Sequence, residues 1–101
     1  MAILTITKAN FEAEVEKSDK PVLLDFYANW CGPCRMLSPI VEEIATERDD
    51  IKVGKINVDD EPDLARAFNI SSIPAIFVVK DGKVTGQSLG LVPKEKLLAL
   101  L

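Results

Sequence analysis

The stretch that decides the fold is VLLDFYANWCGPC, residues 22–34. Its first part, Val22–Ala28, is almost continuously apolar, which predicts a strand buried on both faces. Beyond the two cysteines, apolar residues recur every three or four positions, which predicts a helix with one buried stripe. This stripe comprises Leu37, Ile40, Val41, Ile44 and Ala45. Cys31 and Cys34 are therefore expected where a buried strand ends and a helix begins.

The segments that follow predict a mixed sheet around this strand. Residues 51–58 form a further strand pattern, so strand, helix and strand make a right-handed βαβ unit with parallel strands. Residues 75–79 and 84–89 flank Asp81-Gly82, a dipeptide typical of a hairpin turn. The hairpin adds antiparallel strands to the parallel pair.

Shorter elements are expected around this centre. Ala2–Thr7 predicts a first strand, and Asn10 predicts the N-cap of a helix. Asp59-Asp60 predicts the cap of a short helix with Pro62 in its first turn, and Pro93 opens a last helix. The order β-α-β-α-β-α-β-β-α predicts an α/β protein. We expect a three-layer α/β/α sandwich with a central mixed sheet of about five strands and four flanking helices, in one domain spanning 1–101.

The amino-acid composition excludes several classes of partner and of catalytic site. The chain has 101 residues, 48% of them apolar, with 12 Lys and Arg against 16 Asp and Glu and a net charge of -4. This acidic balance, without a basic run, argues against nucleic acid and anionic membranes as main partners. No apolar run approaches the roughly 18 residues of a spanning helix, and the N-terminus carries no secretion signal, so we expect a cytoplasmic protein. The chain has no His, which excludes a Cys–His nucleophile pair and a His-ligated metal.

The pair Cys31-Gly32-Pro33-Cys34 has four interpretations. A zinc or iron–sulfur site needs about four ligands, so it would have to be shared between two chains. A structural disulfide closing so short a loop would stabilise by only about 2 kcal/mol, and cytosolic thiols are normally reduced. Two unrelated buried cysteines would seldom fall at this spacing beside a βαβ crossover. A redox-active dithiol is favoured, because the unpaired N–H groups and dipole of a helix start stabilise a thiolate at Cys31.

Residues 26–36, FYANWCGPCRM, resemble the active-site segment of the thioredoxin family. The resemblance covers essentially the whole chain, since further matches occur in order and spacing at Asp25, Pro39, Lys55, Ile73-Pro74, Asp81-Gly82 and Gly90. It implies the thioredoxin fold and a thiol–disulfide oxidoreductase that reduces target proteins through a mixed disulfide. Departures from the commonest family pattern leave the preferred reductase and targets open: Tyr27, Arg35, Ser71-Ser72 and Ala75.

We expect the two cysteines of the dithiol to have different roles. Cys31 attacks the target disulfide, and Cys34 resolves the mixed disulfide. Gly32 and Pro33, together with Pro74, form the framework of the site. No cofactor is expected beyond the redox-active disulfide between the two cysteines, and no metal. A thioredoxin reductase, NADPH- or ferredoxin-linked, is expected to recharge it.

Asp25 interrupts the apolar run and has two interpretations. At a strand edge it faces solvent. Buried, it has a pKa raised by desolvation and acts, as the resemblance implies, as the proton acceptor for Cys34. Lys55, in the next strand, is either the charge partner of Asp25 or an ordinary lysine with a solvated ammonium.

A substrate groove beside the cysteines is implied by the resemblance. Most X-Pro bonds are trans, whereas the resemblance implies a cis Ile73–Pro74 bond beside the disulfide. The backbone of Ile73 then pairs with an extended substrate segment, and Trp30, Gly90 and Leu91 line the groove with it. The alternatives are a core aromatic for Trp30 and a simple turn glycine for Gly90.

We therefore expect a monomer that acts on disulfide-containing protein substrates. Two rival functions stay open. One is a non-catalytic binding module that uses the same groove for docking. The other is an oxidase or isomerase of the same fold, although isomerases of this fold commonly carry His where Pro33 stands.

Overall fold

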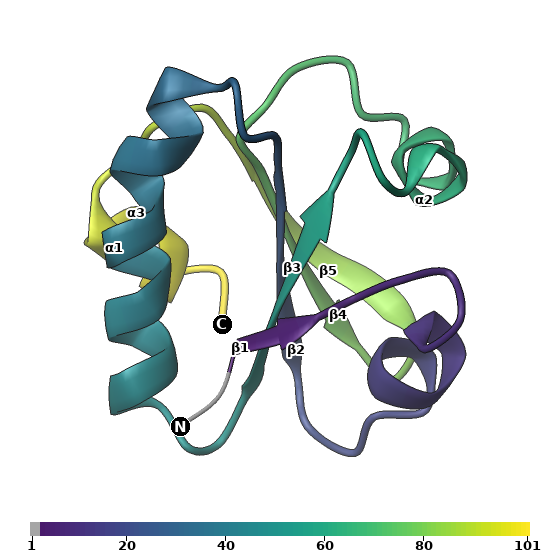
Figure 1. The fold of residues 1–101 in the computed structure, drawn as a ribbon. Helices are drawn as coiled ribbons and strands as arrows, with labels where there is room; N and C mark the ends of the chain where they lie inside the picture. The colour runs from purple at the N-terminus through teal and green to yellow at the C-terminus, as the bar shows by residue number, and fades with distance from the viewer. Residues whose placement is uncertain (1–2) are drawn as a thin grey trace.

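The computed structural model describes residues 3–101, and its elements follow the predicted order (Figure 1). The strands are β1 (Ile3–Thr5), β2 (Val22–Tyr27), β3 (Lys52–Asn57), β4 (Ala75–Lys80) and β5 (Lys83–Leu89). The helical segments are η1 (Glu12–Glu16), α1 (Gly32–Glu47), α2 (Pro62–Ala67) and α3 (Lys94–Leu98). The α/β prediction is confirmed.

β2 occupies the centre of a five-stranded mixed sheet with the order β1-β3-β2-β4-β5. It runs parallel to β3 and antiparallel to β4, which in turn pairs antiparallel with β5. Neighbours on both edges and layers on both faces account for the apolar run, in which Val22–Phe26 are all buried. The predicted βαβ unit and hairpin are both confirmed.

Helical segments cover both faces of this sheet. Figure 1 shows α1 and α3 on one side, and α2 with the η1 turn on the other. Successive β2 side chains alternate between these layers: Leu23 packs with residues of α1, and Leu24 and Phe26 pack with Leu64 of α2. By the same alternation, Asp25 and Tyr27 face α1, the helix that begins at the cysteines.

The helix starts that the sequence predicted differ from those observed. Asn10 caps no helix, because its Oδ1 accepts from the Thr7 amide at 2.8 Å while its Nδ2 donates to the Thr5 carbonyl at 2.9 Å. The segment after it is a π-helical turn, in which the Lys17 amide donates to the Glu12 carbonyl five residues back.

The predicted cap of α2 was also wrong. Neither member of Asp59-Asp60 caps the helix; Glu61 stands at its N-cap without a side-chain hydrogen bond. The first strand is shorter than predicted, ending at Thr5, and Ala2 lies outside the described residues.

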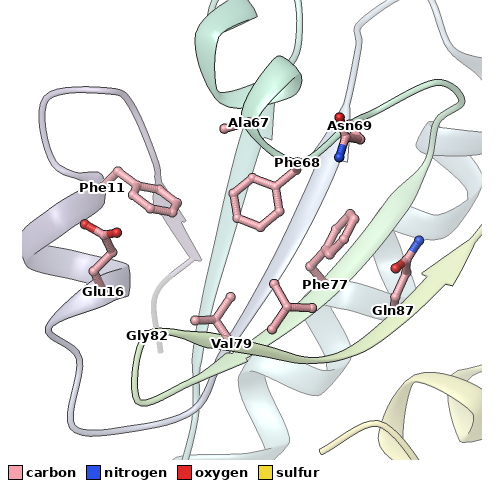
Figure 2. A pocket seen from close by; sticks show the side chains of 10 residues that line it. Phe11, Glu16, Ala67, Phe68, Asn69, Phe77, Val79, Gly82 and Gln87 are labelled. Atoms are coloured by element: carbon pink, nitrogen blue, oxygen red, sulfur yellow. The ribbon is translucent and has the colours of Figure 1, made fainter.

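A hollow of about 570 Å³ opens between η1, the end of α2 and the β4–β5 hairpin (Figure 2). Its apolar wall is an aromatic cluster centred on Phe68, whose ring centroid lies 5.0 Å from that of Phe77 and 5.8 Å from that of Phe11. Neither cysteine lines this hollow. The predicted dithiol therefore lies outside this hollow.

Candidate functional site

The two cysteines lie at the start of α1. Cys31 is the N-cap with an extended backbone, and Pro33 lies in the first turn, as predicted. A disulfide joins Cys31 to Cys34, whose Cα atoms are 5.3 Å apart. The Cys34 amide donates a hydrogen bond to the Cys31 sulfur at 3.2 Å. In the reduced protein the same N–H and the helix dipole favour a thiolate on Cys31.

Asp25 is buried in β2, the strand that leads to this pair. Its side chain is only 1% exposed, so the solvent-facing interpretation was wrong. Its Oδ1 has no hydrogen-bond partner among residues 3–101. Burial raises the pKa of Asp25 from 3.8 to about 6, while the positive charge of Lys55 acts in the opposite direction. Asp25 therefore changes its charge close to neutral pH.

Lys55 is the register partner of Asp25 on the adjacent parallel strand. Its ammonium nevertheless bonds to Ser38 rather than to Asp25, with 3.0 Å between Lys55 Nζ and Ser38 Oγ. The same nitrogen lies 4.6 Å from the centroid of the Tyr27 ring, a cation–π distance. Lys55 thus influences Asp25 through its charge, without a direct hydrogen bond.

A small cavity of about 150 Å³ adjoins these groups. It is lined by Tyr27, Ala28, Asn29, Cys34, Arg35, Ser38 and Lys55. Cys34 and the Lys55–Ser38 pair thereby share one polar space. The sequence analysis did not identify Ser38. The only signal in the sequence was a hydroxyl four residues after Cys34, on the same face of α1, and this side chain is half-buried.

The loop before β4 forms the other wall of the site. The Ile73–Pro74 bond is cis, as the family resemblance implied. The Ile73 carbonyl oxygen lies 3.9 Å from the Cys31 sulfur. A second hollow of about 330 Å³ brings Ile73 together with Trp30, and Val58, Ala65, Ile70, Ser71 and Ser72 complete its lining.

The remaining groove residues lie on the surface. Trp30 is 68% exposed, so the core interpretation was wrong, and its indole N–H donates to Asp59 Oδ2 at 2.9 Å. Gly90 has a φ of +83°, donates its amide to the Pro74 carbonyl at 2.8 Å, and has open space where a Cβ would stand. Gly90 and the exposed Leu91 do not line the hollow that contains Trp30 and Ile73.

Within residues 3–101, no cluster of three or more His, Cys, Asp or Glu side chains is arranged to hold a metal ion. The helices in that part of the chain are all too short or too polar to cross a membrane.

The comparisons with known proteins agree with this geometry. The thioredoxin family model matches residues 2–101. Thioredoxin of Alicyclobacillus acidocaldarius subsp. acidocaldarius is 46% identical over 101 residues, covering 99% of this chain and 95% of that protein. Thioredoxin of Pyropia yezoensis is 47% identical over 102 residues, covering 100% of this chain and 95% of that protein. Thioredoxin of Mycobacterium bovis is 47% identical over 98 residues, covering 96% of this chain and 84% of that protein. With a buried strand leading into Cys31-Gly32-Pro33-Cys34 and matches along its whole length, the chain belongs to the thioredoxin family.

Proposed function

We propose that this thiol–disulfide oxidoreductase acts as a single thioredoxin domain, residues 1–101, in which Cys31 attacks target disulfides and Cys34 resolves them. The observation that carries this assignment is the hydrogen bond from the Cys34 amide to the Cys31 sulfur at 3.2 Å. This bond brings a helix N–H to the sulfur that must bear negative charge, whereas Cys34 is itself a buried residue of the helix's first turn.

The proposed reaction has two steps. The Cys31 thiolate attacks one sulfur of the target disulfide, forms a mixed disulfide and expels the other target sulfur as a thiolate, which takes a proton from water. Cys34 then loses its proton to Asp25 and attacks the Cys31 sulfur. This step closes the Cys31–Cys34 disulfide and releases the second target thiolate, so the target gains two electrons.

Position contributes more to this rate than thiol acidity does. Lowering a thiol pKa from ~8.5 to ~7 raises the thiolate fraction at neutral pH about 15-fold, but the lower nucleophilicity removes about 5-fold. Alignment of the target disulfide with Cys31 must supply most of the remaining acceleration. Trp30 and Ile73, which share a hollow beside Cys31, are proposed to provide that alignment, with Gly90 and Leu91 at its margin.

Partners follow from the family and from this chemistry. Thioredoxins exchange electrons with disulfide-containing protein substrates and with a reductase. We propose that the reductase is NADPH- or ferredoxin-linked and that the protein works as a monomer in the cytoplasm. The net charge of -4 supports protein targets over nucleic acid.

Trapping of mixed disulfides tests the two cysteine roles. Cys34→Ser is expected to accumulate covalent adducts with a disulfide-containing protein, because the resolving thiol is absent. Cys31→Ser is the matched control and is expected to accumulate none. Equal trapping by both variants would contradict the assignment.

A redox titration separates the reductase from its rivals. A potential of the Cys31–Cys34 couple below about -260 mV identifies a reductant, whereas a value of about -180 to -120 mV favours an oxidase or isomerase. A protein that binds partners equally well with both cysteines replaced by Ser, and that has no turnover, would be a docking module.

A further inference from the structure

The hydroxyl of Ser38 is the feature of the site that the reaction scheme leaves unused. Ser38 follows Cys34 by four residues on α1, so the two side chains lie one above the other on the same helix face. Ser38 Oγ is the only hydrogen-bond acceptor that the Lys55 ammonium has within the described chain.

We propose that Ser38 is a positioning residue: it holds the Lys55 ammonium in the wall of the cavity beside Cys34, and thereby fixes the positive charge that faces the buried carboxylate of Asp25. The proposal rests on the function proposed for the Cys31–Cys34 pair. It concerns a contact between α1 and β3 that joins residues 17 positions apart.

The Lys55 ammonium needs a hydrogen-bond partner to stay in this position. Lysine carries a compact, strongly hydrated charge on a flexible stem, so an unheld ammonium moves toward bulk water. Two groups oppose that motion here: Ser38 accepts its hydrogen bond at 3.0 Å, and the Tyr27 ring lies 4.6 Å below it. The ring attracts a cation but sets no hydrogen-bond direction. Loss of the Ser38 hydroxyl therefore removes the contact that fixes the ammonium's place.

Asp25 responds to the position of the ammonium because, among residues 3–101, Lys55 is the only charged group that shifts the pKa of Asp25. From β3 the charged neighbour is Lys55, and from β2 the titratable one is Tyr27. The register partner from β4 is the apolar Ile76. The charged or titratable groups that α1 contributes to the cavity are Cys34 and Arg35, and the Arg35 guanidinium is engaged by the Asn29 carbonyl at 2.7 Å.

The direction of the effect follows from these neighbours. Burial opposes the ionised form of Asp25 and the Lys55 charge supports it. When the Lys55 ammonium moves outward, its charge stabilises the ionised carboxylate less. The pKa of Asp25 then rises, because burial disfavours the ionised form. Fewer molecules then hold an ionised Asp25 near pH 6, and deprotonation of Cys34 slows there.

A carboxyl NMR titration of Asp25 in the oxidised protein tests this inference without any turnover. Ser38→Ala is expected to move the Asp25 midpoint upward by about 0.5 pH unit, which corresponds to roughly a threefold loss of ionised Asp25 below the midpoint. Ser38→Thr restores a hydroxyl and is expected to return the midpoint toward wild type. Thr46→Ala is the matched control, because its hydroxyl lies on the same helix and bonds to Glu42 instead.

A double-variant cycle distinguishes positioning from packing. In a Lys55→Met background, Ser38→Ala is expected to cause no further shift, since no ammonium is left to hold. An unchanged or lowered midpoint in Ser38→Ala, or an equal shift in the Lys55→Met background, would overturn the proposal.

The rate of the resolving step gives the functional readout. Its pH profile in Ser38→Ala is expected to move upward with the Asp25 midpoint, while the rate of attack by Cys31 stays unchanged. A wild-type protein that reduces no disulfide would refute the proposed function, whereas the NMR titration would still decide the position of Lys55.

Discussion

Replacing Asp25 by Asn removes an ionisable group from the interior while keeping its shape, and we expect it to stabilise the folded protein at neutral pH. The pKa of Asp25 is about 6 in the folded protein and 3.8 ordinarily, because burial opposes its charged form. Between these pH values the folded state holds a proton that the unfolded chain has lost. The stability contribution of Asp25 therefore falls as the pH rises from about 4 to about 6.

The size of the effect follows from the same two values. At about 1.4 kcal/mol for each pKa unit, ionised Asp25 costs the folded state about 3 kcal/mol above pH 6. Well below pH 3.8 the carboxyl is protonated in both states and costs nothing. For a domain of 101 residues, 3 kcal/mol corresponds to a rise in Tm of roughly 12 °C or more.

Urea unfolding of wild type and Asp25→Asn at pH 7.5 and pH 3.5 measures this difference. We expect Asn to stabilise at pH 7.5 and to have little effect at pH 3.5. Asp50→Asn is the matched control: hydrogen bonding to Arg48 lowers the pKa of Asp50 to about 2, but this carboxyl is exposed and its ion pair is screened by solvent, so we expect little change in stability at either pH. A gain of equal size at both pH values, or none at pH 7.5, would refute the assignment of the cost to buried charge.

Three further outcomes test the packing and the disulfide. Gly54→Ala is expected to lower the free energy of unfolding by about 1–3 kcal/mol in urea, because its new Cβ would lie 2.5 Å from Ile6 Cγ1; an unchanged midpoint would show that Ile6 moves freely. Leu97→Ala removes a fully buried side chain from the core cluster that includes residues of α1, and it is expected to cost about 2–5 kcal/mol, measured by thermal and urea unfolding; a cost below 1 kcal/mol would contradict its place in the core. Reduction of the Cys31–Cys34 disulfide is expected to lower the unfolding free energy by about 2 kcal/mol, the value for so short a loop, and a much larger loss measured with and without a dithiol would show that the disulfide does more than constrain the unfolded chain.

The layers of the fold were predictable because β2 is buried on all sides. An apolar run that includes Val22–Phe26 fits only a central strand, and the parallel βαβ unit follows from it. Caps were less predictable, since their polar side chains have competing partners. Asp59 accepts from the Trp30 indole, and Asn10 closes a turn, so neither caps a helix.

The residues of the site also fall into those that the sequence predicts and those that it does not. Cys31 and Cys34 are close in sequence, so their spacing and the predicted helix start sufficed to place them. The link between Lys55 and Ser38 depends on how β3 packs against α1, which no local pattern encodes. The direction in which the Lys55 ammonium points could therefore not be predicted from the sequence, because it depends on the packing of β3 against α1.

The site is also distributed over the chain. Cys31 follows β2, Ile73 precedes β4, and Gly90 follows β5, and the Gly90 amide bonds to the Pro74 carbonyl. These segments meet because the antiparallel pairing of β2 with β4 joins the βαβ unit to the hairpin. A chain that has formed only the βαβ unit has the cysteines without the Ile73 and Gly90 segments beside them. A chain that has formed only the hairpin has those segments without the cysteines. Rapid turnover is thus a property of the completely folded molecule, and its recovery during refolding reports the moment at which the two halves of the sheet join.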